Sequence, residues 1–173
     1  DEMLAEFEYL GKDVAREVVI TNTRAIADQV EEIELLPKDL FPPKIERSAE
    51  QLKELVYSKM HRIYGEEPPA IVKDRVDVEL NTILDHHYDV IYMSAQKLVQ
   101  NSLENGYLVG SRGSVGSSMV AFMSGITEVN SLPPHYVCPK CKHSEFVTDG
   151  SYGCGADMPE KDCPECGTRM NRD

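Results

Sequence analysis

The sequence has no long apolar run. Its longest ones, such as Val18-Val19-Ile20, extend over only a few residues, whereas a helix that crosses a bilayer requires roughly 20 consecutive apolar residues. The first ten residues, DEMLAEFEYL, are acidic and do not have the basic flank of a secretory signal. These absences predict a cytoplasmic protein without a membrane partner.

Positive charge is also scarce. The chain holds 18 Lys and Arg residues against 30 Asp and Glu residues, so its formal net charge is -12. A free-standing nucleic-acid-binding domain usually carries a basic face. We therefore expect a solvated acidic surface and poor DNA binding by this chain on its own, although bulk charge does not exclude a local basic site.

Apolar residues at helical spacing are present, and they make up most of the predicted structure. Three helices are predicted: one from Ser48, where Gln51 completes a capping box, to Gly65; one opened by Pro68 and Pro69; and one over about 88–104. The expected inward residues of the third helix are Ile91, Ala95, Leu98 and Val99.

Residues 1–47 are predicted to form a helical segment and a proline-rich linker. Helical spacing covers 1–30 but is expected to break at VVITNT, where Asn22 or Thr23 would cap a second helix. The segment 36–47 holds three prolines in LPKDLFPPKIER and is predicted to be extended.

Cysteine occurs five times, and four of the five form two CxxC pairs. Because a tight CxxC turn offers two thiolates to a tetrahedral metal, the pairs predict a structural zinc ribbon over 133–173 with a closed ligand shell. The predicted ligands are Cys138, Cys141, Cys163 and Cys166. The fifth, Cys154, is either a free thiol or a replacement for one ligand, and His143 could compete despite its poor spacing.

A glycine- and serine-rich stretch, LVGSRGSVGSS, occupies 108–118. The run YLVG at 107–110 predicts a short strand. Residues 114–124 predict a helix with Ser114 as its N-cap and a buried side of Val115, Met119, Phe122 and Met123. Segment 48–132, with this turn at 110–118, is predicted to be one domain.

Such a turn between a strand and a helix suits an anion, because glycine exposes backbone N–H groups, serine adds hydroxyl donors and arginine can fork onto phosphate oxygens. The candidate phosphate-binding residues are Gly110, Ser111, Arg112, Gly113 and Ser114. The alternative is a tight turn with no ligand. The stretch matches neither a Walker A loop nor a dinucleotide-binding GxGxxG motif.

The stretch YLVGSRGSVGSSMVAFMSGITEVNSLPPHYVCP resembles the palm region of the bacterial C-family replicative DNA polymerases of the PolC type. The segments before it, EMLAEFEYLGKDVAREVV and KDRVDVELNTILDHHYDVIYMSAQKLVQNSLENGYLVG, also resemble that family. The resemblance covers essentially the whole chain. It implies the end of the polymerase-and-histidinol-phosphatase-like (PHP) domain, then the start of the palm with a zinc insertion. The implied fold is α+β and mainly helical.

The family's palm is similar to the polymerase-beta-like nucleotidyltransferase fold. The resemblance implies that Gly113 and Ser114 hold the triphosphate of an incoming dNTP with Arg112 as their charge partner, and that carboxylates on a later strand bind Mg²⁺. The nearest DxD-like pattern here, Asp77-Val78-Glu79, lies in a predicted helix where i and i+2 do not share a face, and it is interpreted as solvated surface. This chain alone is therefore expected to be inactive.

For the full-length parent, the resemblance implies a DNA-directed DNA polymerase that acts on dNTPs and primer–template DNA with a replication clamp and other replisome proteins. Two alternatives stay open from the residues. One is a non-enzymatic zinc-ribbon adaptor that binds a protein partner, and the other is a different anion-binding enzyme such as a phosphotransferase.

Overall fold

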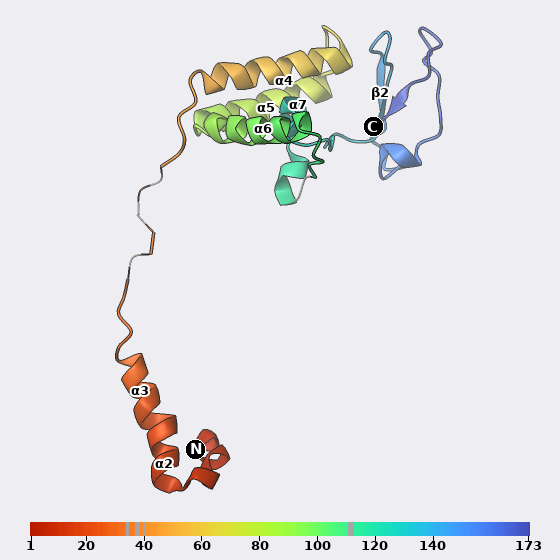
Figure 1. The fold of residues 1–173 in the computed structure, drawn as a ribbon. Helices are drawn as coiled ribbons and strands as arrows, with labels where there is room; N and C mark the ends of the chain where they lie inside the picture. The colour runs from red at the N-terminus through yellow and green to blue at the C-terminus, as the bar shows by residue number, and fades with distance from the viewer. Residues whose placement is uncertain (34, 37–38, 40, 111–112) are drawn as a thin grey trace. The chain divides into compact units, whose positions relative to one another are not determined.

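The computed structural model describes residues 1–33, 35–36, 39, 41–110 and 113–173. The chain forms two compact units, Asp1–Phe41 and Pro42–Asp173 (Figure 1). Within the described residues, no helix is both long enough and apolar enough to cross a membrane.

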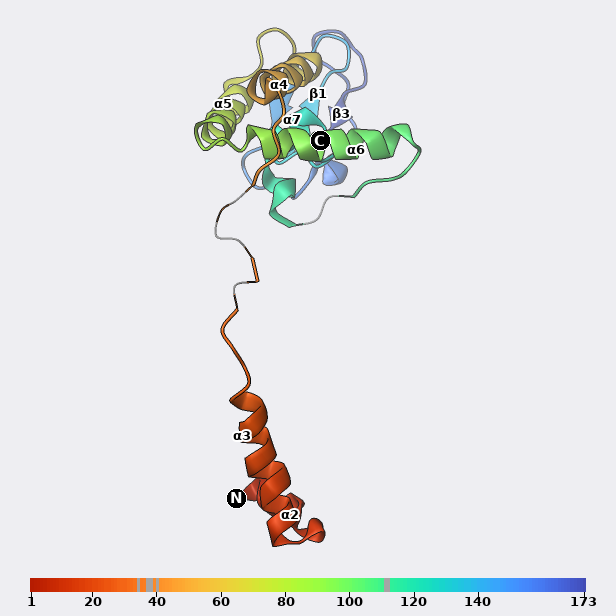
Figure 2. The same cartoon turned by 60° about the vertical axis from the view of Figure 1, so that its left-hand side comes forward.

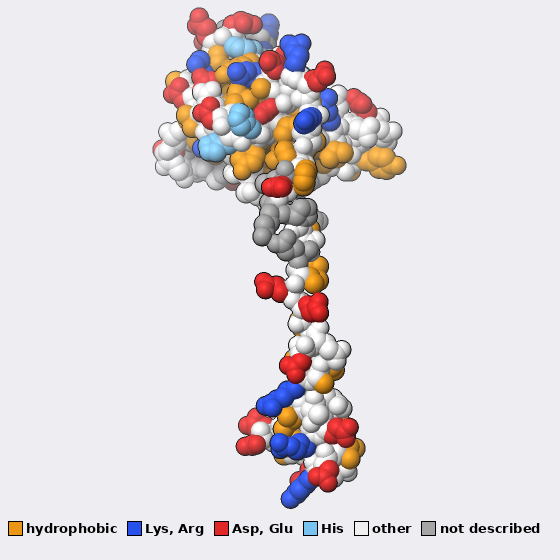
Figure 3. Space-filling view, turned by 90° about the vertical axis from the view of Figure 1, so that its left-hand side faces the viewer, with side chains coloured by type: hydrophobic (Ala, Val, Ile, Leu, Met, Phe, Trp, Pro, Cys, Tyr) orange, Lys and Arg blue, Asp and Glu red, His pale blue; other side chains and the backbone are white. Residues whose placement is uncertain are grey.

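The first unit is helical. In chain order its elements are α1 (Glu2–Glu6), the 3-10 turn η1 (Glu8–Leu10), α2 (Lys12–Arg16), the π-helical turn η2 (Glu17–Thr21) and α3 (Asn22–Ala27). Of its described residues, only Ala15 is buried. Acidic, basic and apolar side chains are mixed along its surface (Figure 3).

The predicted break at VVITNT is wrong, because the backbone remains helical and widens to a π turn there. The Thr23 hydroxyl donates to the carbonyls of Val18 and Val19, so this side chain bonds back into the helix instead of capping a new one. Part of the expected linker at 36–47 lies outside the described residues; 41–45 form neither helix nor strand.

The second unit contains the three helices that the apolar spacing predicts: α4 (Ser48–Tyr64), α5 (Ala70–Asp85) and α6 (Asp89–Glu104). Gly65 ends α4 at a φ of 88°, and its N–H donates to the His61 carbonyl. Pro69 directly precedes α5, as expected of a residue that lacks an N–H donor. Figures 1 and 2 show the three helices packed together.

The predicted capping box at the start of α4 is wrong. Ser48 is buried and its hydroxyl donates to the carboxylate of Asp89, at the start of α6. Gln51 instead donates from Nε2 to the Glu46 carbonyl at 2.7 Å. Ser48 thus joins two helices, a contact that the local sequence pattern does not reveal.

A short helix, α7 (Met119–Ser124), completes the core, and all six of its residues are buried. It packs against α4 and α5, whose inward faces supply most of the remaining core. The core residues of α4 and α5 are Leu52, Val56, Met60, Tyr64, Val72, Val76, Leu80 and Ile83. Because both ends of α7 are buried, the helix holds in place the chain segments directly before and after it.

The orientation of α6 differs from the prediction. Met93 and Gln96 are its buried residues, while Ile91 and Leu98 are 49% and 69% exposed. Several apolar faces of this helix were available, and the packed one includes a glutamine whose Nε2 donates to Gln100 at 2.7 Å. The other two expected inward residues, Ala95 and Val99, are half-buried, so apolar spacing alone placed the buried face only in part.

The glycine–serine stretch is not flanked by a strand. Residues 107–110 form neither helix nor strand, and Leu108 is 99% exposed, so the predicted strand is wrong. A 3-10 turn, η3 (Gly113–Ser117), precedes α7, and the N-cap of α7 is Ser118 instead of Ser114. The helix begins later because the Ser118 side chain accepts the Ala121 N–H.

The C-terminal part holds a three-stranded antiparallel sheet in the order β2-β1-β3. The strands are β1 (His135–Val137), β2 (Ser144–Phe146) and β3 (Asn171–Arg172). His135 pairs with Phe146, and Tyr136 pairs with both Glu145 and Arg172. The molecule is mainly helical with a small sheet, as expected.

Candidate metal centre and glycine–serine turn

The four cysteines of the CxxC pairs meet at one point, with their sulfur atoms all within 4.8 Å of one another. The sulfurs of Cys138 and Cys166 are 3.4 Å apart, and so are those of Cys141 and Cys163. Sulfurs bound at 2.3 Å to a tetrahedral zinc ion lie about 3.8 Å apart. The arrangement therefore fits a single tetrahedral ion.

Each CxxC pair lies in a turn of the same form. The N–H of Lys142 donates to the Cys138 carbonyl at 3.1 Å, and the N–H of Gly167 donates to the Cys163 carbonyl at 2.8 Å. Lys142 and Gly167 adopt left-handed φ angles of 68° and 70°. A residue in this conformation reverses the chain after each pair, so both sulfurs of a pair face the same side.

The thiols differ in acidity. Hydrogen bonding with the Thr168 side chain and backbone lowers the pKa of the Cys166 thiol to about 6. Although a backbone hydrogen bond with His143 lowers the pKa of Cys141, burial and the neighbouring sulfurs raise it to about 12. Four thiolates this close repel one another, and a bound dication compensates that charge. The donor set thus suits a divalent metal.

The other two candidate ligands lie apart from the cluster. Cys154 is exposed, and its thiol contacts the carboxylate of Asp157 at 3.4 Å. The ring nitrogens of His143 lie 3.2 Å from Glu145 and 3.1 Å from Glu165. Both side chains therefore have partners of their own outside the four-sulfur group.

The sheet that carries the cluster packs on the helices through His135. This side chain is fully buried, stacks on the Phe146 ring at 4.4 Å and contacts the Tyr64 hydroxyl through Nε2 at 2.9 Å. Burial lowers the pKa of His135 and raises that of Tyr64 to about 12. Because Nδ1 lies 2.8 Å from the Pro133 carbonyl, it carries the proton and Nε2 accepts from Tyr64.

Three of the five predicted phosphate-binding residues are described. Ser111 and Arg112 lie outside the described residues, whereas Gly110, Gly113 and Ser114 are exposed. Gly113 has a φ of +75°, and a Cβ atom added to Gly110 or Gly113 would meet no atom within 4 Å. The backbone of this stretch is therefore open to an approaching group.

The end of the turn is fixed by hydrogen bonds. The Ser117 hydroxyl donates to the Ser114 carbonyl at 2.7 Å and closes η3. The Ser118 hydroxyl oxygen accepts the Ala121 N–H at 3.1 Å and caps α7. The two serines together join an exposed turn to a fully buried helix.

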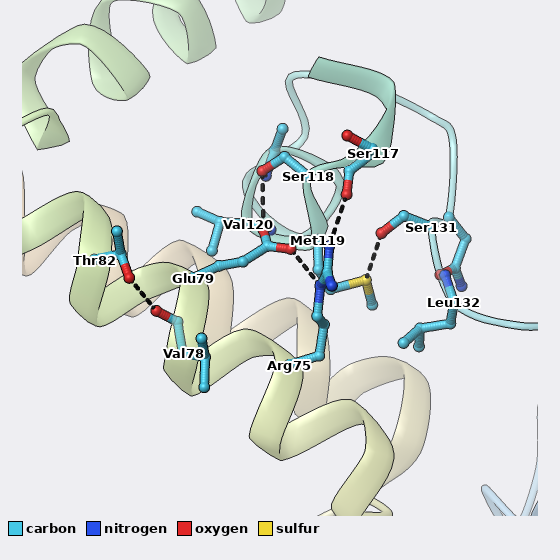
Figure 4. Close-up of polar contacts among 12 residues, drawn as sticks. Arg75, Val78, Glu79, Thr82, Ser117, Ser118, Met119, Val120, Ser131 and Leu132 are labelled. Carbon is cyan, nitrogen blue, oxygen red and sulfur yellow. Dashed lines mark hydrogen bonds and ion pairs between the residues drawn. The ribbon is translucent and has the colours of Figure 1, made fainter. Parts of the chain in front are cut away.

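Two charged side chains of α5 also contact the turn, as Figure 4 shows. Glu79 Oε2 accepts from the Ser118 hydroxyl at 3.1 Å and from the Val120 N–H at 3.2 Å. Arg75 donates to Glu79 Oε1 at 2.5 Å and to the Ser117 carbonyl at 3.3 Å. A carboxylate of the protein itself thus accepts one of the N–H groups in the first turn of α7, that of Val120.

The interpretation of Asp77-Val78-Glu79 as solvated surface is therefore wrong for both acids. Asp77 accepts from the Tyr57 hydroxyl at 2.8 Å, and Glu79 faces the turn with 17% of its side chain exposed. As expected from i and i+2 spacing, the two carboxylates have different partners. The Arg75–Glu79 pair at i and i+4 was visible in the sequence, but its contact with the turn was not.

The chain is similar to known proteins over its whole length. Residues 50–148 match the family described as the bacterial DNA polymerase III alpha NTPase domain. Proteins named DNA polymerase III PolC-type from Caldanaerobacter subterraneus subsp. tengcongensis, Clostridium perfringens and Bacillus subtilis are 63%, 58% and 54% identical over 173 residues. In each case the match covers 100% of this chain and 12% of the relative.

Proposed function

We propose that this chain, which belongs to the family of the bacterial DNA polymerase III alpha NTPase domain, is part of a replicative DNA-directed DNA polymerase and binds the triphosphate of an incoming dNTP at its glycine–serine turn. The family match spans the turn at 110–118 as well as α5, α6 and all of α4 except its first two residues. The chain spans 12% of the length of its relatives, so the polymerase activity is proposed for the whole protein.

One observation carries the assignment of the turn. Gly113 and Ser114 are exposed with open space beside the glycine, yet the residues that follow them are anchored in a fully buried helix. A site for a multiply charged ligand requires donors that are held in place before the ligand arrives, because this reduces the ordering cost of binding. An open backbone on a rigid support meets that requirement.

The phosphate donors would come from 110–114. The second and third amides of α7, on Val120 and Ala121, are already occupied by Glu79 and Ser118. Backbone N–H groups near Gly113, the Ser114 hydroxyl and the Arg112 guanidinium would neutralise the triphosphate, as fixed donors do in other phosphate sites.

The proposed zinc and magnesium ions belong to two different sites. Among the described residues, the four cysteines are the only group of three or more potential ligands close enough to hold an ion. We assign structural Zn²⁺ to them, and the closed four-sulfur shell leaves no position for a reactive water. Carboxylates that hold catalytic Mg²⁺ would lie elsewhere in the whole polymerase, so this chain alone is expected not to extend a primer.

Nucleotide titration of the zinc-loaded 173-residue chain tests the assignment of the turn. We expect dATP with Mg²⁺ to bind more tightly than dAMP or inorganic phosphate, and Arg112→Ala to weaken dATP binding, because a guanidinium forks onto phosphate oxygens. Equal affinity for dATP and phosphate would favour a general phosphotransferase. No binding of any nucleotide would leave the zinc-ribbon adaptor as the better interpretation.

Primer–template DNA, a replication clamp and other replisome proteins are proposed partners of the whole polymerase. This proposal rests on the family alone. The formal net charge of -12 agrees with it only in part, because an acidic segment needs basic surfaces from other parts of the protein to hold DNA.

A further inference from the structure

The contact between α5 and the glycine–serine turn has a feature that phosphate binding alone does not explain. A carboxylate, Glu79, contacts Ser118 and Val120, a few residues after the segment proposed to receive a triphosphate, and only 17% of its side chain is exposed. Like charges repel, so a glutamate beside an anion site is unfavourable on charge alone. Its presence therefore calls for a different role.

We propose that Glu79 and Arg75 form a clamp that positions the turn for the triphosphate, an inference that rests on the proposed function. The two oxygens of Glu79 have separate partners. Oε2 accepts from the Ser118 hydroxyl and the Val120 N–H, and Oε1 accepts from Arg75 (Figure 4). One side chain thus ties α5 to the first residues of α7.

Arg75 extends the clamp toward the exposed part of the turn. Its Nη2 donates to the Ser117 carbonyl, and the Ser117 hydroxyl donates to the Ser114 carbonyl. Ser114 is one of the residues proposed to contact phosphate. Two hydrogen bonds in series therefore connect the α5 arginine to the proposed site, and Glu79 holds the guanidinium in the required orientation through Nε.

The carboxylate could act in the opposite sense, as a plug that competes with an incoming anion for the donors of α7. The clamp and the plug predict changes of opposite sign when the charge of Glu79 is removed. With a plug, the neutral variant would bind triphosphate more tightly. With a clamp, it would bind more weakly, because the Ser118 hydroxyl, the Val120 N–H and Arg75 would no longer share one anionic acceptor group.

Glu79→Gln and Asp74→Asn form a matched pair for this test. Both remove one negative charge from α5, but Asp74 is exposed and donates or accepts no hydrogen bond with the described residues of the turn, 110 and 113–118. Each variant of the zinc-loaded chain is titrated with dATP in the presence of Mg²⁺. We expect Asp74→Asn to bind within a factor of about two of wild type because solvent screens the charge, and Glu79→Gln roughly tenfold more weakly because charge-assisted hydrogen bonds are lost.

Amide hydrogen exchange without nucleotide gives a second measurement. We expect faster exchange at Val120 in Glu79→Gln and unchanged exchange at that amide in Asp74→Asn. Protection of Val76 and Leu80 in α5 shows whether the variant retains its fold. If Glu79→Gln does not fold, Arg75→Lys replaces it, since a lysine cannot contact Glu79 and Ser117 together through a fork, and the same loss of dATP affinity is expected.

The outcomes separate the two proposals. If wild type binds dATP and Glu79→Gln binds it equally well or more tightly, the clamp is overturned and the proposed function stands. If wild type binds no nucleotide, the proposed function fails and the clamp as a device for positioning phosphate fails with it. Weaker binding by Glu79→Gln and not by Asp74→Asn, together with faster exchange at Val120, establishes the clamp.

Discussion

The four-cysteine cluster and the glycine–serine turn are both compact sites, but they are built in different ways. The cluster draws all four ligands from two short turns of the same form, and each turn is closed by backbone bonds within a few residues. The turn takes its support from α5, through hydrogen bonds that span 39 and 42 residues of sequence. A site of the first kind can be recognised from spacing, whereas a site of the second kind cannot.

The difference also concerns what each site requires in order to fold. The cysteine turns bring thiolates together against their mutual repulsion, so their stability depends on a metal. The glycine–serine turn depends on the apolar burial of α7 and on the pair of charged residues in α5. Perturbing each support in turn should therefore affect one site and spare the other.

The largest effect is expected from removing the metal. Structural zinc sites supply roughly 10–16 kcal/mol of apparent free energy, while the ribbon's own core is small and consists of Tyr136, Met158 and Met170 with two of the cysteines. We expect chelation to unfold 136–170 and leave α4, α5 and α6 helical. Far-UV circular dichroism and amide exchange, measured with and without chelator, check this.

Thiol titration supplies the control for that experiment. One zinc per chain should protect four thiols and leave Cys154 reactive, because it is exposed and outside the cluster. Cys154→Ser should retain full zinc content, whereas Cys163→Ser should lose it. Loss of all helical signal on chelation would contradict the expected independence, and the buried contact of His135 with Tyr64 would then be its most direct cause.

A smaller but still substantial loss of stability is expected when a buried side chain of α7, the helix that supports the turn, is shortened. Met119 is fully buried at the start of α7, and a buried methionine replaced by alanine costs about 2–5 kcal/mol. We expect Met119→Ala to lower the free energy of unfolding of the helices, measured by urea denaturation, and to leave zinc content unchanged. Leu108→Ala, at a side chain 99% exposed, should change that free energy by less than about 0.5 kcal/mol.

The features that the sequence predicts correctly are mostly those set by residues close together in the chain. Periodic apolar residues such as Leu52 and Val72 identify α4 and α5, Gly65 marks a helix end, and the CxxC spacing indicates the metal cluster. In these cases the residues that determine the structure are neighbours in sequence. Local rules of helix periodicity and turn conformation are then sufficient.

Two failures have local causes, since Thr23 bonds back to Val18 and Val19, and Ser118 caps α7 through Ala121. The other failures involve a distant partner. Ser48 bonds to Asp89 in another helix instead of capping its own, and Leu98 lies exposed because a different face of α6 met the core. Leu108 belongs to a β-prone run, but within the part of the chain that the structure describes no strand pairs with it. The contact of Glu79 with Ser118 was missed for the same reason, since no local pattern specifies which helix will lie beside a turn.

A pH-dependent loss of stability is expected where the ribbon joins the helices. Burial lowers the pKa of His135 below its ordinary value of 6.5, although the hydrogen bond to the Pro133 carbonyl and the charge of Asp173 oppose this in part. The folded state therefore favours neutral histidine, and the unfolded state binds a proton first as pH falls. The contribution of His135 to the free energy of unfolding should be fully present above pH 6.5. It should decline as pH falls from there through the lowered pKa, by about 1.4 kcal/mol for each unit of pKa difference between the folded and unfolded states.

Thermal denaturation between neutral and mildly acidic pH checks this, with zinc content measured at each point because acid also protonates thiolates. In His135→Asn, the part of the slope that belongs to the histidine should disappear. His86→Gln, at an exposed histidine, should retain the wild-type slope. An unchanged slope in His135→Asn would assign the pH dependence to the metal site alone.

The smallest effects compare the two cysteine turns directly, since Lys142 and Gly167 occupy equivalent left-handed positions. Left-handed backbone costs a non-glycine residue roughly 1–2 kcal/mol, so Gly167→Lys should lower the melting temperature. Lys142→Gly relieves that strain but loses packing against Gly65. The two residues lie close together, since a Cβ atom added to Gly65 would be 3.2 Å from the Cβ of Lys142. We expect a net gain below about 1 kcal/mol, since glycine also adds entropy to the unfolded chain. Destabilisation by Lys142→Gly would mean that the contact with α4 outweighs backbone strain, and that the first cysteine turn, like the glycine–serine turn, depends on a distant helix.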